Sequence, residues 1–214
     1  MLRVLLCAFA LKFAAPAFAD PPEGEITAAP GSIAIGMIEN AGAEGIFDIV
    51  HNGQVSVRHI GSGMRCDFER NGEGGRIVIF PQLRRGDNVA CDQHDDHQAI
   101  TIYATRYPQQ TNLREQIEIA DGAILQRFAD ATPYTIADPA NASAPVPTNH
   151  VRYIVTWNDE RSFTRASVAI IGDWTIKMRY SAYVADDAAA RQAEETATQI
   201  FLQTLRDLEP PGNL

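Results

Sequence analysis

Hydrophobic and polar residues alternate along much of this 214-residue chain, a pattern typical of half-buried β-strands. The first clear unit is GIFDIVHNGQVSVRHI, residues 45–60, in which Asn52-Gly53 separates two alternating runs. Asn-Gly is typical of two-residue hairpin turns, because both central positions of that turn require positive φ. Such a turn pairs Val50 with Val55. It places four apolar residues on the core face: Ile46, Val50, Val55 and Val57.

Further alternating runs predict more strands. They are GMRCDFE (63–69), RIVIF (76–80), VAC (89–91), AITIYATRY (99–107), VRYIVTW (151–157), SFTRASVAIIG (162–172) and DWTIKMRYSAY (173–183). In the last run, Trp174 and Met178 face one way, whereas Lys177 and Arg179 face the other. We therefore expect the apolar side of this strand to lie in the core.

Two segments have the period of a helix instead. Between residues 112 and 128, apolar residues recur at helical spacing, and Asn112 with Glu115 resembles a capping box. A second helix is expected over about 186–208, beginning at Asp186 or Asp187 and ending before Pro210. Each helix has a single apolar stripe and must therefore cover a sheet.

Runs of strands followed by long helices, without β-α-β alternation, predict an α+β fold. We expect antiparallel sheet with the two helices packed on it. The predicted organisation is a signal peptide at 1–19, a flexible segment rich in Pro, Gly and Ala at 20–45, and one domain at 46–209. A proline-rich linker at 133–149 interrupts that domain.

The N-terminus predicts the compartment. MLRVLLCAFALKFAAPAFA has Arg3 near its start, then a short apolar run and an Ala17-Phe18-Ala19 cleavage site, as in secretory signal peptides. We expect a periplasmic or secreted protein with no membrane span after cleavage, because no later apolar run is long enough. The full chain has 18 basic and 27 acidic residues, a net charge of −9. This acidity argues against nucleic-acid partners.

Cleavage leaves Cys66 and Cys91, an even number of cysteines in an oxidising compartment. A Cys66–Cys91 disulfide is expected. In a simple meander, however, the strand RIVIF would lie between the two cysteines and hold them about 10 Å apart, which exceeds disulfide reach. Either the strand order is not sequential, or Cys91 lies at an edge or bend.

The segment CDQHDDHQ, residues 91–98, is the candidate for metal chemistry. His94 and His97 form a His-x-x-His pair, and Asp92 and Asp95 add carboxylates, a set that suits Zn²⁺ or Cu²⁺. Four ligands within six residues strain a loop, however, and most structural sites draw on two separate segments. The simpler interpretation is a solvated acidic loop between two strands.

Other chemistry is less well defined. Ser62, in IGSGMR, lies in a Gly-Ser-Gly turn before a strand rather than in a nucleophile elbow, and no base or orienting residue can be assigned to it. We expect four basic residues to share one polar sheet face: Lys177, Arg179, Arg165 and Arg152. That face would bind an anion or an acidic partner, face solvent, or be covered by the Glu-bearing side of a helix.

The segment RASVAIIGDWTIKMRYSAY, followed by the C-terminal helix, resembles the PsbP-like α/β/α sandwich of exported accessory proteins. The shared feature is a Gly-x-Trp-x-x-Lys-x-Arg-like turn between two strands, and ITIYATRY before the first helix matches an earlier step. The stretch RHIGSGMRC also resembles uncharacterised exported bacterial proteins with an H-x-x-S-G-x-x-C pattern. The resemblance implies export, a structural disulfide and a binding or assembly role, and it assigns no site residues.

The sequence thus favours an exported, non-catalytic binding or accessory protein. Its partner would be an envelope protein or a small ligand, and no cofactor is required. One alternative is a divalent-metal protein that binds Zn²⁺ or Cu²⁺ through residues 92–97. The other is a hydrolase whose site is not visible in the sequence.

Overall fold

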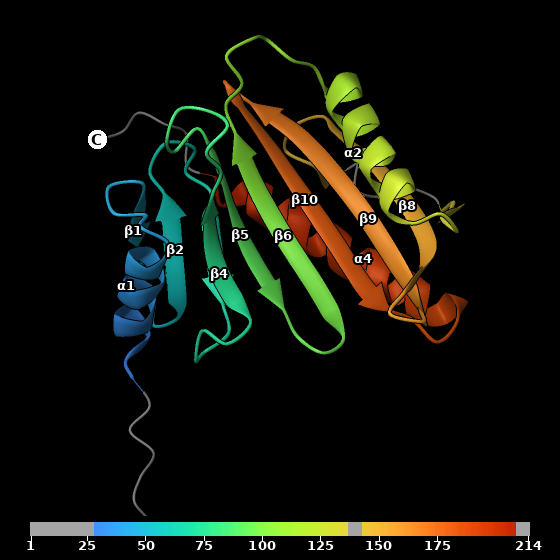
Figure 1. Ribbon diagram of the computed structural model, residues 1–214, viewed down its shortest axis with the longest axis horizontal. Coiled ribbons are helices and arrows are strands. Elements are labelled where there is room, and N and C mark those ends of the chain that lie inside the picture. Colours follow the sequence, from blue (N-terminus) through green and yellow to red (C-terminus); the bar gives the residue numbers. More distant parts are fainter. Residues whose placement is uncertain (1–27, 137–142, 209–214) are drawn as a thin grey trace, which may run out of the picture.

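The computed structural model describes residues 28–136 and 143–208. The predicted signal peptide at 1–19 lies outside these ranges. The largest element is a seven-stranded antiparallel sheet with the order β4-β5-β6-β10-β9-β8-β7 (Figure 1). Its strands are β4 (Gly75–Ile79), β5 (Asn88–His94), β6 (Gln98–Thr105), β7 (Thr132–Pro133), β8 (Thr148–Trp157), β9 (Glu160–Ile171) and β10 (Trp174–Tyr183).

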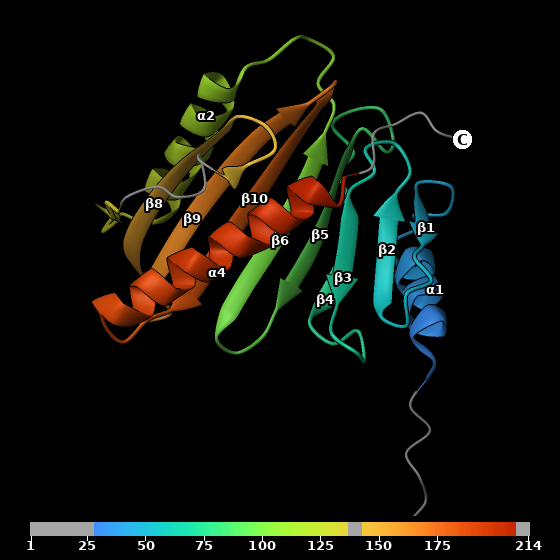
Figure 2. The same cartoon turned by 180° about the vertical axis from the view of Figure 1, so that it is seen from behind.

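The two predicted long helices cover opposite faces of this sheet (Figures 1 and 2). Helix α2 (Leu113–Arg127) packs on β8 and β9, and α4 (Asp187–Arg206) packs on β9 and β10 from the other side. Both N-caps follow from the sequence, since Asn112 accepts a hydrogen bond from the Glu115 amide and Asp186 accepts one from the Ala189 amide. The predicted α+β class with antiparallel sheet is confirmed.

A smaller sheet of three strands, β1 (Phe47–Ile49), β2 (Val55–His59) and β3 (Arg65–Phe68), lies beside the first. Its apolar face joins the same core as the α4 side of the large sheet. That core includes Val57, Cys66, Ile77, Val89 and Phe201. The two sheets and α4 thus share one hydrophobic interior.

The predicted register of the β1–β2 hairpin is wrong by one residue. Ile49 pairs with Val57, and the Val50 amide bonds the Ser56 carbonyl, so Val50 does not pair with Val55. Phe47 rather than Ile46 is the buried residue of β1. The cause is a turn that contains one residue more than predicted. Within it, the Asn52 side chain accepts a hydrogen bond from the Gln54 amide.

The segment 20–45, expected to be flexible, contains helix α1 (Pro30–Asn40). Pro30 opens the helix, where a missing N–H does no harm, and Ala34 and Ile38 are buried against β1, β2 and β4. The predicted linker 133–149 is also shorter than expected, because Pro133 belongs to β7 and β8 begins at Thr148. Residues 137–142 lie outside the described part of the chain.

The Cys66–Cys91 disulfide is formed, with a Cα–Cα distance of 6.1 Å. Cys66 lies on β3 of the small sheet and Cys91 on β5 of the large one. The difficulty posed by a simple meander therefore disappears, because the cysteines face each other between two sheets and do not sit on next-but-one strands of a single sheet.

In the described ranges, no helix combines the length and the apolar character needed to cross a membrane.

Candidate functional site

The predicted metal loop forms the connection between β5 and β6. Asp92 lies within β5, where its carboxylate pairs with Arg76 at 2.6 Å and accepts a hydrogen bond from the Thr101 hydroxyl, also at 2.6 Å. Asp95 accepts hydrogen bonds from the backbone amides of His97 and Gln98. Partial burial alone would raise the pKa of Asp95, but these hydrogen bonds outweigh it and lower the pKa.

The loop therefore uses its carboxylates to hold its own backbone and a neighbouring strand. His94 and His97 are exposed. Within residues 28–136 and 143–208, no three His, Cys, Asp or Glu side chains are grouped so that they would hold a metal ion. Binding through Asp92 would require this carboxylate to exchange Arg76 and Thr101 for the ion, so the metal site stays a prediction.

Ser62 and His59 form a buried pair in the turn between β2 and β3. His59 Nδ1 accepts a hydrogen bond from the Ser62 amide, so this nitrogen carries no proton and the Ser62 hydroxyl donates to it at 2.8 Å. The same hydroxyl oxygen accepts from the Met64 amide. Gly61 leaves no room for a side chain, since a Cβ there would lie 2.9 Å from Trp174. These contacts fix the turn in place.

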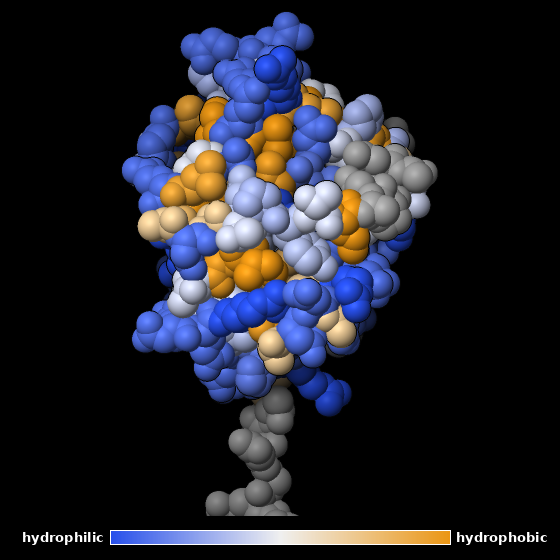
Figure 3. Space-filling view, turned by 90° about the vertical axis from the view of Figure 1, so that its right-hand side faces the viewer, coloured by the Kyte–Doolittle hydropathy of each residue, from blue (hydrophilic) through white to orange (hydrophobic). Residues whose placement is uncertain are grey.

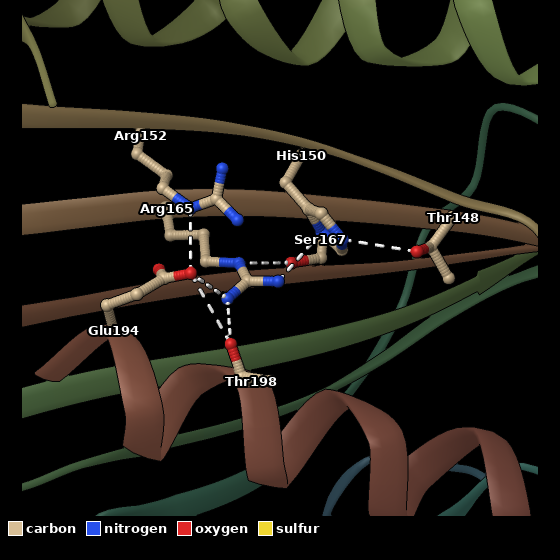
Figure 4. Close-up of polar contacts among 7 residues, drawn as sticks. All are labelled: Thr148, His150, Arg152, Arg165, Ser167, Glu194 and Thr198. Carbon is tan, nitrogen blue, oxygen red and sulfur yellow. Dashed lines mark hydrogen bonds and ion pairs between the residues drawn. The ribbon is translucent and has the colours of Figure 1, made fainter. Parts of the chain in front are cut away.

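A network of charged and polar groups is buried between β8, β9 and α4 (Figure 4). Arg165 is fully buried and donates to Glu194 Oε1 at 2.7 Å, and Arg152 donates to the same oxygen at 2.7 Å. Arg165 also donates to Ser167, Thr198 and His150 Nδ1. Since a guanidinium only donates, His150 accepts at Nδ1 and carries its proton at Nε2, beside the Thr148 hydroxyl.

This network corrects the predicted polar face. In the sheet, Arg179 lies opposite Ala166, and Arg165 lies opposite Tyr180. Arg165 and Arg152 therefore point to the α4 side, where Glu194 covers them, while Lys177 and Arg179 point to the α2 side. The four basic residues do not share a face, although the expectation of coverage by a Glu-bearing helix is right for two of them.

The α2 side of the large sheet is only partly covered, because α2 packs on β8 and β9 and leaves β4, β5, β6 and β10 open (Figure 1). One row of paired residues crosses this open face. It consists of Arg76, Asp92, Thr101 and Arg179, on four adjacent strands. The row begins with the Arg76–Asp92 ion pair and ends with Arg179, which is half-buried.

A cavity of about 530 Å³ lies over this row. Two aromatic pairs contribute to its wall: Phe80 stacks with Tyr103 at 6.1 Å between ring centroids, and Trp157 stacks with Tyr183 at 5.1 Å. The charged side chains in the lining are Arg76, Arg127, Arg179, Asp92 and Asp95, together with His94.

Arg179 is the notable group in this cavity. Among the described residues it forms no ion pair and no side-chain hydrogen bond, whereas the neighbouring Lys177 donates to the Tyr107 hydroxyl at 3.0 Å. The Arg127 guanidinium lies over the Phe128 ring at 5.2 Å. Arg179 therefore presents several N–H donors to the cavity, in the planar arrangement that suits a carboxylate or phosphate.

The sequence indicated part of this site. Alternation in β10 places Arg179 on the polar side, but it does not show which other strands lie beside it. The pairing of β6 with β10, across about 75 residues of chain, brings in Tyr103 and Thr101. The Arg76–Asp92 pair is hard to predict from the sequence. Opposite charges stabilise directly paired positions, but the sequence does not show which positions pair.

Comparison with known proteins adds little. No family model and no curated protein matches the chain. Among solved structures, the crystal structure of LpqN, involved in cell envelope biogenesis of Mycobacterium tuberculosis, aligns with 60% of this chain and 84% of that chain. The identity is 10% and the TM-score 0.35, a likeness that carries no argument about fold or function.

Proposed function

We propose that the protein is an exported, non-catalytic binding protein for a small anionic ligand, held on the open face of the seven-stranded sheet. The observation that carries the proposal is Arg179, a half-buried guanidinium on the floor of a cavity of about 530 Å³ with no acidic partner in the described part of the chain. A partly desolvated charge without a counterion costs free energy. An anion that binds there recovers this cost and forms charge-assisted hydrogen bonds.

The charges around the cavity support an anion. Three guanidinium groups line it, from Arg76, Arg127 and Arg179, against the two carboxylates of Asp92 and Asp95. Arg76 and Asp92 neutralise each other, which leaves Arg127 and Arg179 against Asp95. The cavity is thus locally positive in a chain whose net charge is −9, so it concentrates anions that the rest of the surface repels.

The aromatic wall supports a ligand with an apolar part. Ligand cavities typically combine apolar and aromatic lining with a few polar groups that fix orientation. Here Phe80, Tyr103, Trp157 and Tyr183 supply the apolar lining, and Arg179 supplies the orienting charge.

Export is supported by the disulfide. Disulfides persist in oxidising compartments and are rare in the cytosol. The Cys66–Cys91 bridge therefore agrees with the secretory signal predicted at residues 1–19 and with a periplasmic or secreted location.

The test compares two dyes of similar shape. 8-Anilinonaphthalene-1-sulfonate is an aromatic anion, and N-phenyl-1-naphthylamine is its neutral counterpart; both fluoresce in apolar sites. We expect the anion to bind the folded protein at one site. Arg179→Gln should raise the Kd of the anion about ten- to a hundredfold, the worth of a charge-assisted hydrogen bond, and leave the neutral dye unaffected.

The matched control is Arg70→Gln. Arg70 is exposed and does not line the cavity, so this variant removes the same charge elsewhere. Circular dichroism and thermal melts verify that each variant is folded. The proposal fails if the Arg179→Gln and Arg70→Gln variants bind the anion with equal Kd. It also fails if Arg179→Gln raises the Kd of the neutral dye as much as that of the anion.

A further inference from the structure

A second, smaller cavity adjoins the first. It has a volume of about 220 Å³ and lies between α2 and the sheet. Tyr103 and Arg179 line both cavities, so the two lie next to each other at these residues. Its remaining lining is Ile119, Ala120 and Ala123 from α2, Ala166 and Ser167 from β9, and Lys177 and Met178 from β10.

The two cavities differ in chemistry. The larger one holds guanidinium and carboxylate groups, whereas the α2 flank of the smaller one carries only apolar side chains: Ile119, Ala120 and Ala123. The Lys177 ammonium is bound to the Tyr107 hydroxyl, so this residue offers the smaller cavity mainly its aliphatic stem. Arg179 lies where the two cavities meet, between the charged lining of the larger one and the apolar lining of the smaller one.

We propose that the ligand is an anionic amphiphile, with its head group on Arg179 and its hydrocarbon chain along the α2 flank of the smaller cavity. This inference rests on the proposed function and specifies the class of its ligand. A carboxylate and a phosphate monoester share the chemistry required of the head group, since both match the donors of Arg179.

Packing on α2 supports a chain at this position. Ile119 is 55% exposed, although it stands next to the apolar cavity. Ala120 and Ala123 are small, which leaves the groove between the helix and β10 open. A hydrocarbon chain in this groove would remove apolar surface of Ile119 and of itself from water, the main favourable term in such binding.

The side of the molecule on which α2 and β8 lie favours a small ligand over a protein partner. Seen from the side on which α2 and β8 lie, apolar residues form separate patches between hydrophilic ones (Figure 3). Stable protein interfaces need a contiguous area with a well-packed apolar centre. A narrow apolar groove that ends at one cation fits an amphiphile better.

The first experiment is a chain-length series. Octanoate, decanoate and dodecanoate are titrated calorimetrically below their micellar concentrations, with decanamide as the neutral analogue and decyl phosphate as the second head group. The Kd should fall by up to about fourfold for each added methylene, the worth of burying that group. Decanoate and decyl phosphate should both bind more tightly than decanamide.

Two matched pairs of variants test where the hydrocarbon chain of the ligand lies. Ile119→Ser and Leu125→Ser each remove an exposed apolar side chain from α2, but only Ile119 lines the cavity. Ala123→Trp and Gln126→Trp each add an indole to α2, and only the first fills the groove. We expect Ile119→Ser to raise the Kd of dodecanoate at least threefold and Ala123→Trp to abolish the chain-length dependence, with both controls unchanged.

The outcomes separate this inference from the proposed function. If affinity is independent of chain length while Arg179→Gln still weakens octanoate, the amphiphile is ruled out and the anion site stands. If Ile119→Ser and Leu125→Ser behave alike, the chain lies elsewhere and the inference fails. If decanamide binds as tightly as decanoate, the proposed function fails as well.

Discussion

His59 is a buried histidine that folding keeps neutral. It is 2% exposed and packs against the rings of Phe47 and Trp174. Burial lowers its pKa from 6.5 to about 4, although a hydrogen bond to the Gly86 backbone acts in the opposite direction. The Ser62 contacts at Nδ1 need the unprotonated nitrogen, so geometry and solvation favour the same form.

This neutral form makes stability depend on pH. Well above pH 6.5, His59 is neutral in both the folded and the unfolded chain, so it adds no pH dependence to the free energy of unfolding. As the pH falls from 6.5 to about 4, the unfolded chain binds a proton that the folded chain does not, so the free energy of unfolding decreases. At pH 4 the loss should approach about 3 kcal/mol.

The variant His59→Asn tests this contribution. Asparagine keeps an acceptor for Ser62 but does not titrate, so the variant should be less stable at pH 7 yet lose about 3 kcal/mol less than the wild type between pH 7 and pH 4. Urea denaturation at several pH values measures the difference. If the free energy of unfolding depends on pH equally in the two proteins, His59 is not the cause, because the remaining titratable groups are the same in both.

At the scale of elements, α4 is attached to the sheet by charge as well as by its apolar stripe. Glu194 is 2% exposed and accepts hydrogen bonds from both Arg152 and Arg165 through Oε1. Removing one partner of a buried ion pair leaves an uncompensated charge, which is far costlier than removing a surface charge.

Glu194→Gln should therefore lower the free energy of unfolding by about 3 kcal/mol, since two guanidinium groups lose the charge of the carboxylate that they share. Glu195→Gln is the matched control, because Glu195 is the next residue on the same helix and is exposed. It should change stability by no more than about 0.5 kcal/mol. Urea denaturation at pH 7 compares the two, and equal effects would contradict the role of Glu194.

The elements themselves could be predicted from periodicity. Alternation in β10 correctly identified Trp174 and Met178 as core residues, and the caps at Asn112 and Asp186 located both long helices. SIAIGMIEN was compatible with one short element, but its type could not be predicted, because it lies in a segment rich in small residues and the helicity of α1 depends on packing against the small sheet.

The register of the strands and the sheet face on which each side chain lies were harder to predict, because they depend on turns and on strands that are distant in the sequence. Asn52-Gly53 did not form the two-residue turn that its sequence favours. That geometry occurs instead at Asn158-Asp159, between the paired residues Trp157 and Glu160, where both central residues have positive φ. Likewise, the separation of Arg165 from Arg179 follows from the β9–β10 register, which the sequence of either strand alone does not specify.

At the scale of the whole molecule, the Cys66–Cys91 bridge joins the small sheet to the large one. Because it closes a loop of 25 residues, it should contribute about 3 kcal/mol by restricting the unfolded chain. The double variant Cys66→Ala/Cys91→Ala should melt at a correspondingly lower temperature. Dithiothreitol should lower the Tm of the wild type toward that of the variant and leave the variant unchanged; any shift of the variant would point to another cause.

The strand order has a further consequence, for the way the chain acquires its structure. Residues 174–183 follow all the other strands of the large sheet in the chain, yet they form β10 at its centre, between β6 and β9. Until they arrive, β6 is an unprotected edge whose backbone groups are open to pairing with other chains. Closure over such long sequence separations is slow. If the chain is exported as we propose and crosses the membrane N-terminus first, the edge of β6 stays unpaired until β10 follows, and a chaperone that binds unfolded chains would protect it from aggregation.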